Sequence, residues 1–125
     1  MVTDPDIVQV LPRDGVTLVR IRAVAILSEE QVEAFGQALR ALGEVPGQRV
    51  VLSFLGVQQL TSQALGELIR LHKHLAQNGG KLHLADIDPR IYEIFSITRL
   101  DRSFRIFERE EEAVASFLGE RGAEA

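Results

Sequence analysis

The feature that most constrains this chain is an uninterrupted apolar run, Val50-Val51-Leu52, which lies between two helix-like patterns. Successive side chains of a β-strand point to opposite faces of the sheet, so a run without polar alternation indicates a strand that is buried on both faces. Such a strand requires helices that cover its sheet. The run therefore predicts an α/β protein.

The two flanking patterns each predict an amphipathic helix. The apolar residues before the run recur at steps of three and four, which places them on one helix face. They are Val32, Phe35, Leu39 and Leu42. Ser28 and Gln31 have the spacing of a capping box at the start of this helix, and Gly43 and Pro46 mark its end.

The second helix is expected to begin near Thr61-Ser62 and to end at the turn signal Asn78-Gly79-Gly80. Its apolar residues form a wide face, and a polar stripe runs along the opposite side. The stripe consists of Gln63, Glu67, Arg70 and His74. We expect these four side chains to face the solvent together.

Shorter patterns complete a ββαβαβαβα order. Two β-rich runs, 7–11 and 17–22, flank a loop at 12–15 that contains Asp14-Gly15, which is a hairpin signal. A strand at 81–85, a helix from Pro89, a strand at 104–107 and a helix at 110–118 follow. Strands that alternate with helices favour a mostly parallel sheet covered by helices.

Length and composition limit the function. We expect a single domain over residues 1–119 with a polar tail at 120–125. The formal net charge is −4, from 14 basic and 18 acidic residues, which argues against a generic nucleic-acid surface. The chain has no cysteine, so disulfides, thiolate zinc sites and thiol catalysis are excluded. We predict no signal peptide and no membrane span, and hence a cytoplasmic protein.

Candidate catalytic and metal-binding patterns are weak. His72 and His74 are two residues apart on a helix and point to different faces, so we interpret them, with His83, as ordinary surface or boundary residues. Asp88 is explained as the N-cap before Pro89. The sequence contains no phosphate-binding glycine loop. We therefore predict neither an enzyme nor a cofactor or metal site.

Four motifs in order resemble the STAS domain family, the sulfate-transporter and anti-sigma-factor-antagonist domain. They are Val50 to Val57, Leu60 to Gly66, Gly79 to Leu84, and Pro89 to Phe104, the last resembling the family segment that ends in TGLDRLF. The resemblance covers 17–118 and is strongest to small free-standing bacterial antagonists. It implies a mixed, mostly parallel sheet of four to five strands flanked by about four helices.

The resemblance also implies a function by binding. Family antagonists sequester an anti-sigma factor that is also a serine kinase, and phosphorylation of a serine at the head of the central helix ends the interaction. The family pattern Asp-Ser-Ser-Gly-Leu-Gly falls on 61–66, which places Gln63 at the usual phospho-acceptor position and Thr61 at the preceding Asp. Ser53 and Ser28 stand where the family often has carboxylates. The usual kinase switch is therefore predicted to be lost or rebuilt.

Our leading hypothesis is a non-catalytic docking module that binds an anti-sigma factor or a related histidine-kinase-like ATPase regulator. The predicted contact is the loop 55–60 and the start of the central helix, with no role for nucleic acid or membrane. The contact residues are Gln58, Thr61, Ser62, Gln63, Glu67 and Arg70. Ser62 or Thr61 is the fallback phosphate acceptor.

Two other hypotheses about the function stay open. One is a structural STAS subunit of a larger signalling scaffold, in which exposed apolar residues on the edge strand 7–11 support self-association as a weak homodimer. The other is a module that senses a small ligand or nucleotide, for which the sequence has no recognisable motif.

Overall fold

A computed structural model describes residues 7–124 and places the apolar run 50–52 in the middle strand of a five-stranded sheet. The strand order is β1-β2-β4-β6-β7, in which β1 is antiparallel to β2 and the other neighbours are parallel. This arrangement confirms the α/β class and the mixed, mostly parallel sheet. In chain order, the elements are β1 (Val8–Arg13), β2 (Val16–Ile21), β3 (Ala25–Ile26), α1 (Glu29–Gly43), β4 (Arg49–Ser53), β5 (Gln59–Leu60), α2 (Ser62–Gln77), β6 (Lys81–Ala85), α3 (Pro89–Ile97), η1 (Leu100–Arg102), β7 (Arg105–Phe107) and α4 (Glu110–Glu124).

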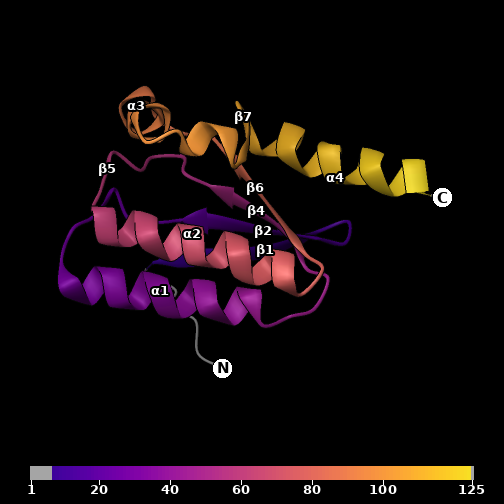
Figure 1. Ribbon diagram of the computed structural model, residues 1–125, viewed down its shortest axis with the longest axis horizontal. Coiled ribbons are helices and arrows are strands. Elements are labelled where there is room, and N and C mark those ends of the chain that lie inside the picture. The colour runs from indigo at the N-terminus through magenta and orange to yellow at the C-terminus, as the bar shows by residue number, and fades with distance from the viewer. Residues whose placement is uncertain (1–6, 125) are drawn as a thin grey trace.

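Helices cover both faces of the sheet. Figure 1 shows α1 and α2 side by side on one face and α4 on the other. Val50 and Leu52 belong to the large core beneath α1 and α2, whereas Val51 belongs to a smaller core beneath α4. All three side chains are fully buried, as the unbroken apolar run predicts.

The first two strands form a hairpin with a two-residue turn. Asp14 and Gly15 both have positive φ angles, 54° and 83°, which is the conformation that suits a tight hairpin between twisted strands. β1 therefore extends to Arg13 and β2 begins at Val16. The loop between them has two residues, whereas a four-residue loop at 12–15 was predicted.

Several helix boundaries follow the sequence signals. Ser28 caps α1 with the complete capping box to Gln31, and the Asp88 carboxylate accepts a hydrogen bond from the Arg90 backbone N–H at 2.8 Å. The last helix extends to Glu124, beyond the predicted end at Leu118, so residues 120–124 of the expected polar tail are helical.

A second, two-stranded sheet was not predicted. It consists of β3 and β5, which pair in parallel, with Ala25 opposite Gln59 and Ile26 opposite Leu60. A strand of two residues has no periodic pattern that a sequence could display.

Over residues 7–124, the structure contains no helix that is both long and apolar enough to cross a membrane.

Candidate functional site

The start of α2 lies beyond the carboxyl ends of the parallel strands, where α/β proteins commonly bind their ligands. After β4, the chain passes through a loop into β5 and then directly into α2. The Thr61 N–H donates a hydrogen bond to the Ile26 carbonyl oxygen at 3.2 Å. The small β3–β5 sheet therefore holds the start of α2 against the segment that leads into α1 (Figure 1).

The residues at the head of α2 have different environments. The Thr61 hydroxyl caps the helix by accepting a hydrogen bond from the Ala64 N–H at 3.1 Å. Ser62 and Gln63 are both exposed. Of the two hydroxyl groups, that of Ser62 is the accessible one, and the Gln63 amide occupies the surface beside it.

Exposed apolar side chains lie on the segments around this helix terminus. Leu55, in the loop after β4, is 66% exposed, and Val24 and Leu27, before α1, are 58% and 51% exposed. The Gln58 N–H donates to the Val24 carbonyl oxygen at 2.7 Å, which joins the two segments, and the Gln58 side chain is exposed. Exposed apolar side chains on neighbouring segments are characteristic of interaction surfaces. Sequence reasoning located the loop but missed Val24 and Leu27, because only the unpredicted β3–β5 pairing brings them there.

The predicted outward orientation of Glu67 is wrong. Its side chain is only 12% exposed and lies against α1, where it pairs with Arg40 at 3.4 Å and also with Arg70. A Cβ atom at Gly36 would lie 2.8 Å from the Glu67 Cδ atom. The absence of a side chain at Gly36 therefore lets α1 approach and cover this part of the polar stripe.

His74 is covered in the same way by the second glycine of α1. A Cβ atom at Gly43 would lie 2.6 Å from the His74 Nδ1 atom. Arg70, by contrast, is 65% exposed and remains on the surface. The stripe is thus divided into exposed residues and residues that mediate helix packing.

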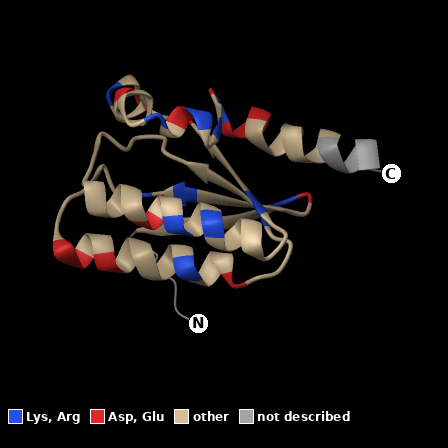
Figure 2. Ribbon diagram, viewed as in Figure 1, with Lys and Arg blue, Asp and Glu red and all other residues tan. Residues whose placement is uncertain are grey.

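A groove of about 340 Å³ runs between α1 and α2 from Gln63. Glu29 and Glu33 line it near the start of α1, and Arg40 and Arg70 line it farther along. Figure 2 shows the same separation of acidic and basic residues along these helices. The groove therefore continues the surface at the start of α2, and its lining carries charges of both signs.

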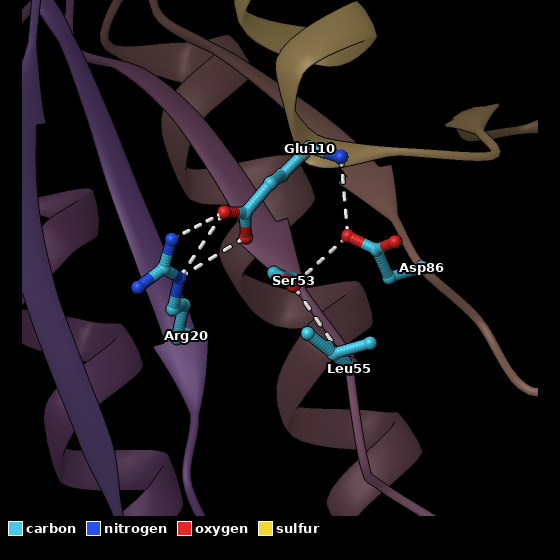
Figure 3. Close-up of polar contacts among 5 residues, drawn as sticks. All are labelled: Arg20, Ser53, Leu55, Asp86 and Glu110. Carbon is cyan, nitrogen blue, oxygen red and sulfur yellow. Dashed lines mark hydrogen bonds and ion pairs between the residues drawn. The ribbon is translucent and has the colours of Figure 1, made fainter.

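A partly buried polar network lies under the loop that contains Leu55 (Figure 3). Ser53 is fully buried; its hydroxyl donates to the Asp86 carboxylate at 3.3 Å and accepts from the Leu55 N–H at 3.4 Å. Asp86 also accepts from the Glu110 N–H at 3.1 Å, and the Glu110 carboxylate forms an ion pair with Arg20. The network connects the base of the loop to the start of α4.

The two carboxylates of this network have opposite pKa shifts. Burial raises the pKa of Asp86 above its ordinary value, although hydrogen bonds from the Glu110 N–H and the Ser53 hydroxyl oppose that effect. The hydrogen bond from Arg20 is the main cause of the lowered pKa of Glu110. Because the Ser53 side chain is fully buried where it contacts Asp86, the network supports the base of the loop.

The histidines are structural. His83 is buried, whereas a surface or boundary position was predicted. It is 2% exposed, stacks on Phe117 at 3.8 Å between ring centroids, and its Nδ1 atom lies 2.9 Å from the Ser116 Oγ atom. His72 packs against Phe104, and burial lowers its pKa. Among the residues that the structure describes, no group of three or more His, Cys, Asp or Glu side chains could hold a metal ion.

Comparison with known proteins decides the family. Residues 8–113 match the STAS domain. The chain belongs to the STAS family. No curated protein matches its sequence.

Solved structures share the STAS fold with this protein at low sequence identity. An anti-sigma-factor antagonist (STAS) domain protein from Planctomyces limnophilus has a TM-score of 0.77 and 21% identity, over 87% of this chain and 95% of that one. An anti-sigma factor antagonist from Mycobacterium paratuberculosis has a TM-score of 0.72 and 22% identity, over 92% and 97%. The murine anion transporter Solute Carrier 26 family member A9 has a TM-score of 0.67 and 19% identity, over 81% of this STAS chain but 17% of its own.

Proposed function

We propose that this STAS domain is a non-catalytic docking module that binds an anti-sigma factor or a related histidine-kinase-like ATPase regulator in the cytoplasm. The observation that carries the proposal is the exposed head of α2, where Ser62 and Gln63 lie beside the exposed Leu55 loop. Apolar anchors next to polar groups are the composition expected of a protein-binding surface. The similarity in fold to anti-sigma factor antagonists supports this class of partner.

The contact we propose consists of the loop 55–60 and the start of α2. Gln58, Ser62, Gln63 and Arg70 contribute through exposed groups, together with Val24, Leu27 and Leu55. Glu67 contributes indirectly, because its carboxylate fixes the exposed Arg70 guanidinium. Thr61 likewise acts through the helix cap.

We further propose that docking is not ended by phosphorylation at the position of Gln63, because an amide does not accept a phosphoryl group. If a kinase partner transfers phosphate to this helix terminus, Ser62 is the acceptor we assign, since the Thr61 hydroxyl is engaged in the cap. Intact-mass measurement after incubation with the purified partner and ATP tests this. An unchanged mass is expected, and a mass gain that persists in Ser62→Ala would contradict the assignment.

Binding is tested with matched variants on one helix. The wild-type chain is used to capture partners from its native cell, a captured histidine-kinase-like ATPase is purified, and its affinity is measured by calorimetry. Gln63→Glu places a negative charge at the head of α2, and Gln77→Glu places the same charge at its exposed end. We expect Gln63→Glu and Leu55→Asp to weaken binding at least about tenfold, and Gln77→Glu to leave it unchanged.

Two results would reject the docking proposal. One is that no ATPase regulator is captured. The other is that Gln63→Glu and Leu55→Asp bind as well as Gln77→Glu does. Circular dichroism of each variant separates a loss of contact from a loss of folding.

A further inference from the structure

Strand β1 forms an open edge of the main sheet (Figure 1). Within residues 7–124, its inner side pairs with β2 and no strand pairs with its outer side. Proteins usually protect such an edge with charged residues or by making the strand very short. β1 is six residues long, and its one charged residue, Arg13, lies at its end.

The direction of each peptide group follows from the pairing with β2. The Arg22 N–H donates to the Ile7 carbonyl oxygen at 2.8 Å, and Val8 lies opposite Ile21. Residues of an antiparallel strand point their N–H and C=O groups alternately toward each neighbour. Ile7 and Gln9 therefore turn these groups toward β2, whereas Val8 and Val10 turn theirs outward.

A groove of about 520 Å³ follows this edge between β1 and α1. Its lining is largely apolar, and two of its valines are well exposed, Val10 at 41% and Val45 at 47%. Exposed aliphatic side chains beside outward-facing peptide groups provide both components of a strand-addition site. This surface shares no residue with the docking surface proposed above.

We propose that the occupant is a second copy of this chain, whose β1 pairs antiparallel with this β1 and joins the two sheets into one. Val8 then lies opposite Val10 of the second copy, and Gln9 lies on the two-fold axis. In this register, the outward N–H and C=O groups of Val8 and Val10 satisfy one another. Pro12, which has no N–H to donate, lies outside the paired valines.

Self-pairing is favoured over another partner by the symmetry and charge of the strand. A two-fold contact requires a patch that is complementary to itself, and an antiparallel strand paired with its own copy meets that condition. The segment from Val8 to Leu11 is uncharged, so no like charges are brought opposite one another. Each copy would also cover exposed Val10 of the other.

Cross-linking tests the register directly, because the chain has no native cysteine. Residues on the axis of this pairing form a non-hydrogen-bonded pair with Cα atoms about 4.5 Å apart, which a disulfide can join. Oxidation of Gln9→Cys is expected to give a disulfide-linked dimer. Gln37→Cys, at an exposed position of α1, is the control and should give no disulfide-linked dimer. Equal cross-linking of both variants would overturn the proposal.

Light scattering over a concentration series tests the dimer in solution with the full chain. Wild type should shift from monomer to dimer as the concentration rises. Val10→Lys should stay monomeric, because each lysine would lie opposite an apolar Val8 of the other copy and the two lysines would be diagonal neighbours of like charge. Ile97→Lys is the matched control, since Ile97 is a 74% exposed residue of α3 and its variant should dimerise as wild type does. A wild-type chain that stays monomeric would overturn the proposal. So would a chain that dimerises only after residues 1–6 are removed, because that segment would then be the occupant of the edge.

Discussion

Glu110 makes two kinds of contact at the start of α4. Its backbone N–H donates to Asp86, and its carboxylate receives hydrogen bonds from the Arg20 Nε atom at 3.2 and 3.1 Å in addition to the ion pair. The Arg20 side chain is 37% exposed, so solvent weakens the pair. We expect Glu110→Gln to lower the free energy of unfolding by about 1–2 kcal/mol at neutral pH.

This loss should disappear in acid. The folded pKa of Glu110 is lowered, so its stabilising contribution is present above its unfolded value of 4.5 and is lost as the pH falls through the folded pKa. Urea unfolding of wild type and Glu110→Gln at pH 7 and well below pH 4.5 measures the difference. An equal difference at both pH values would contradict an electrostatic origin.

Asp86→Asn is the matched control for the direction in which stability changes with pH. The folded pKa of Asp86 is raised, so its ionised form is disfavoured by folding and destabilises the protein as the pH rises through that pKa. An asparagine at this position still offers an oxygen to the Glu110 N–H and the Ser53 hydroxyl. Its stability relative to wild type should therefore increase with pH, the opposite trend to that of Glu110→Gln.

The surroundings of three glycines in α1 and α2 predict the order of stability of their glycine-to-alanine variants. A Cβ atom at Gly66 would meet nothing closer than the Arg70 Nη2 atom at 3.9 Å, so Gly66→Ala should gain about 1 kcal/mol from helix propensity. Gly36→Ala would displace only the flexible end of Glu67 and should be close to neutral. Gly43→Ala would displace the His74 ring and should lose about 1–2 kcal/mol. Urea unfolding of the three variants checks the order, which would be refuted if Gly43→Ala were as stable as Gly66→Ala.

The helices could be predicted from the sequence, but the way they pack could not. Apolar spacing and the Ser28 cap predicted where α1 lies and where it begins, because those signals depend on residues within one or two helical turns. The covering of Glu67 depends on Gly36, a residue of another helix, so the pattern of α2 alone placed Glu67 in solvent. The same limit explains why Val24 was not predicted as part of the proposed docking surface.

The candidate site was predictable where it lies within one segment and not where it depends on distant contacts. The head of α2, with Thr61 as its cap, could be expected from the hydroxyl pair and the family resemblance. The network under the loop that contains Leu55 joins Ser53 of β4, Asp86 after β6 and Glu110 of α4, which are distant in the sequence. Asp86 has a φ angle of 57° and follows β6, and no local sequence signal predicts that its carboxylate is oriented toward α4.

In the whole molecule, the two faces of the sheet are covered unequally. The core beneath α1 and α2 extends over most of the buried apolar residues, and α3 also contributes to it. The core beneath α4 has few buried members. They are Val16, Leu18, Val51, Ala85, Ala113 and Phe117. Among the described elements, α4 has no helical neighbour on its face comparable to the α1–α2 pair.

This asymmetry predicts that α4 opens before the rest of the molecule. Free energies of local opening follow buried apolar contact, so amide hydrogens of α4 should exchange through a lower-energy opening than those of α1, α2 and β4. Phe117→Ala removes the ring that stacks on His83, and it should cost roughly 3–5 kcal/mol and accelerate exchange in α4 most. Native-state hydrogen exchange followed by NMR measures both effects, with Phe35→Ala in the large core as the control that should accelerate exchange throughout. Equal opening free energies for α4 and α2 in wild type would contradict this prediction, because they would mean that the two cores unfold together as one unit.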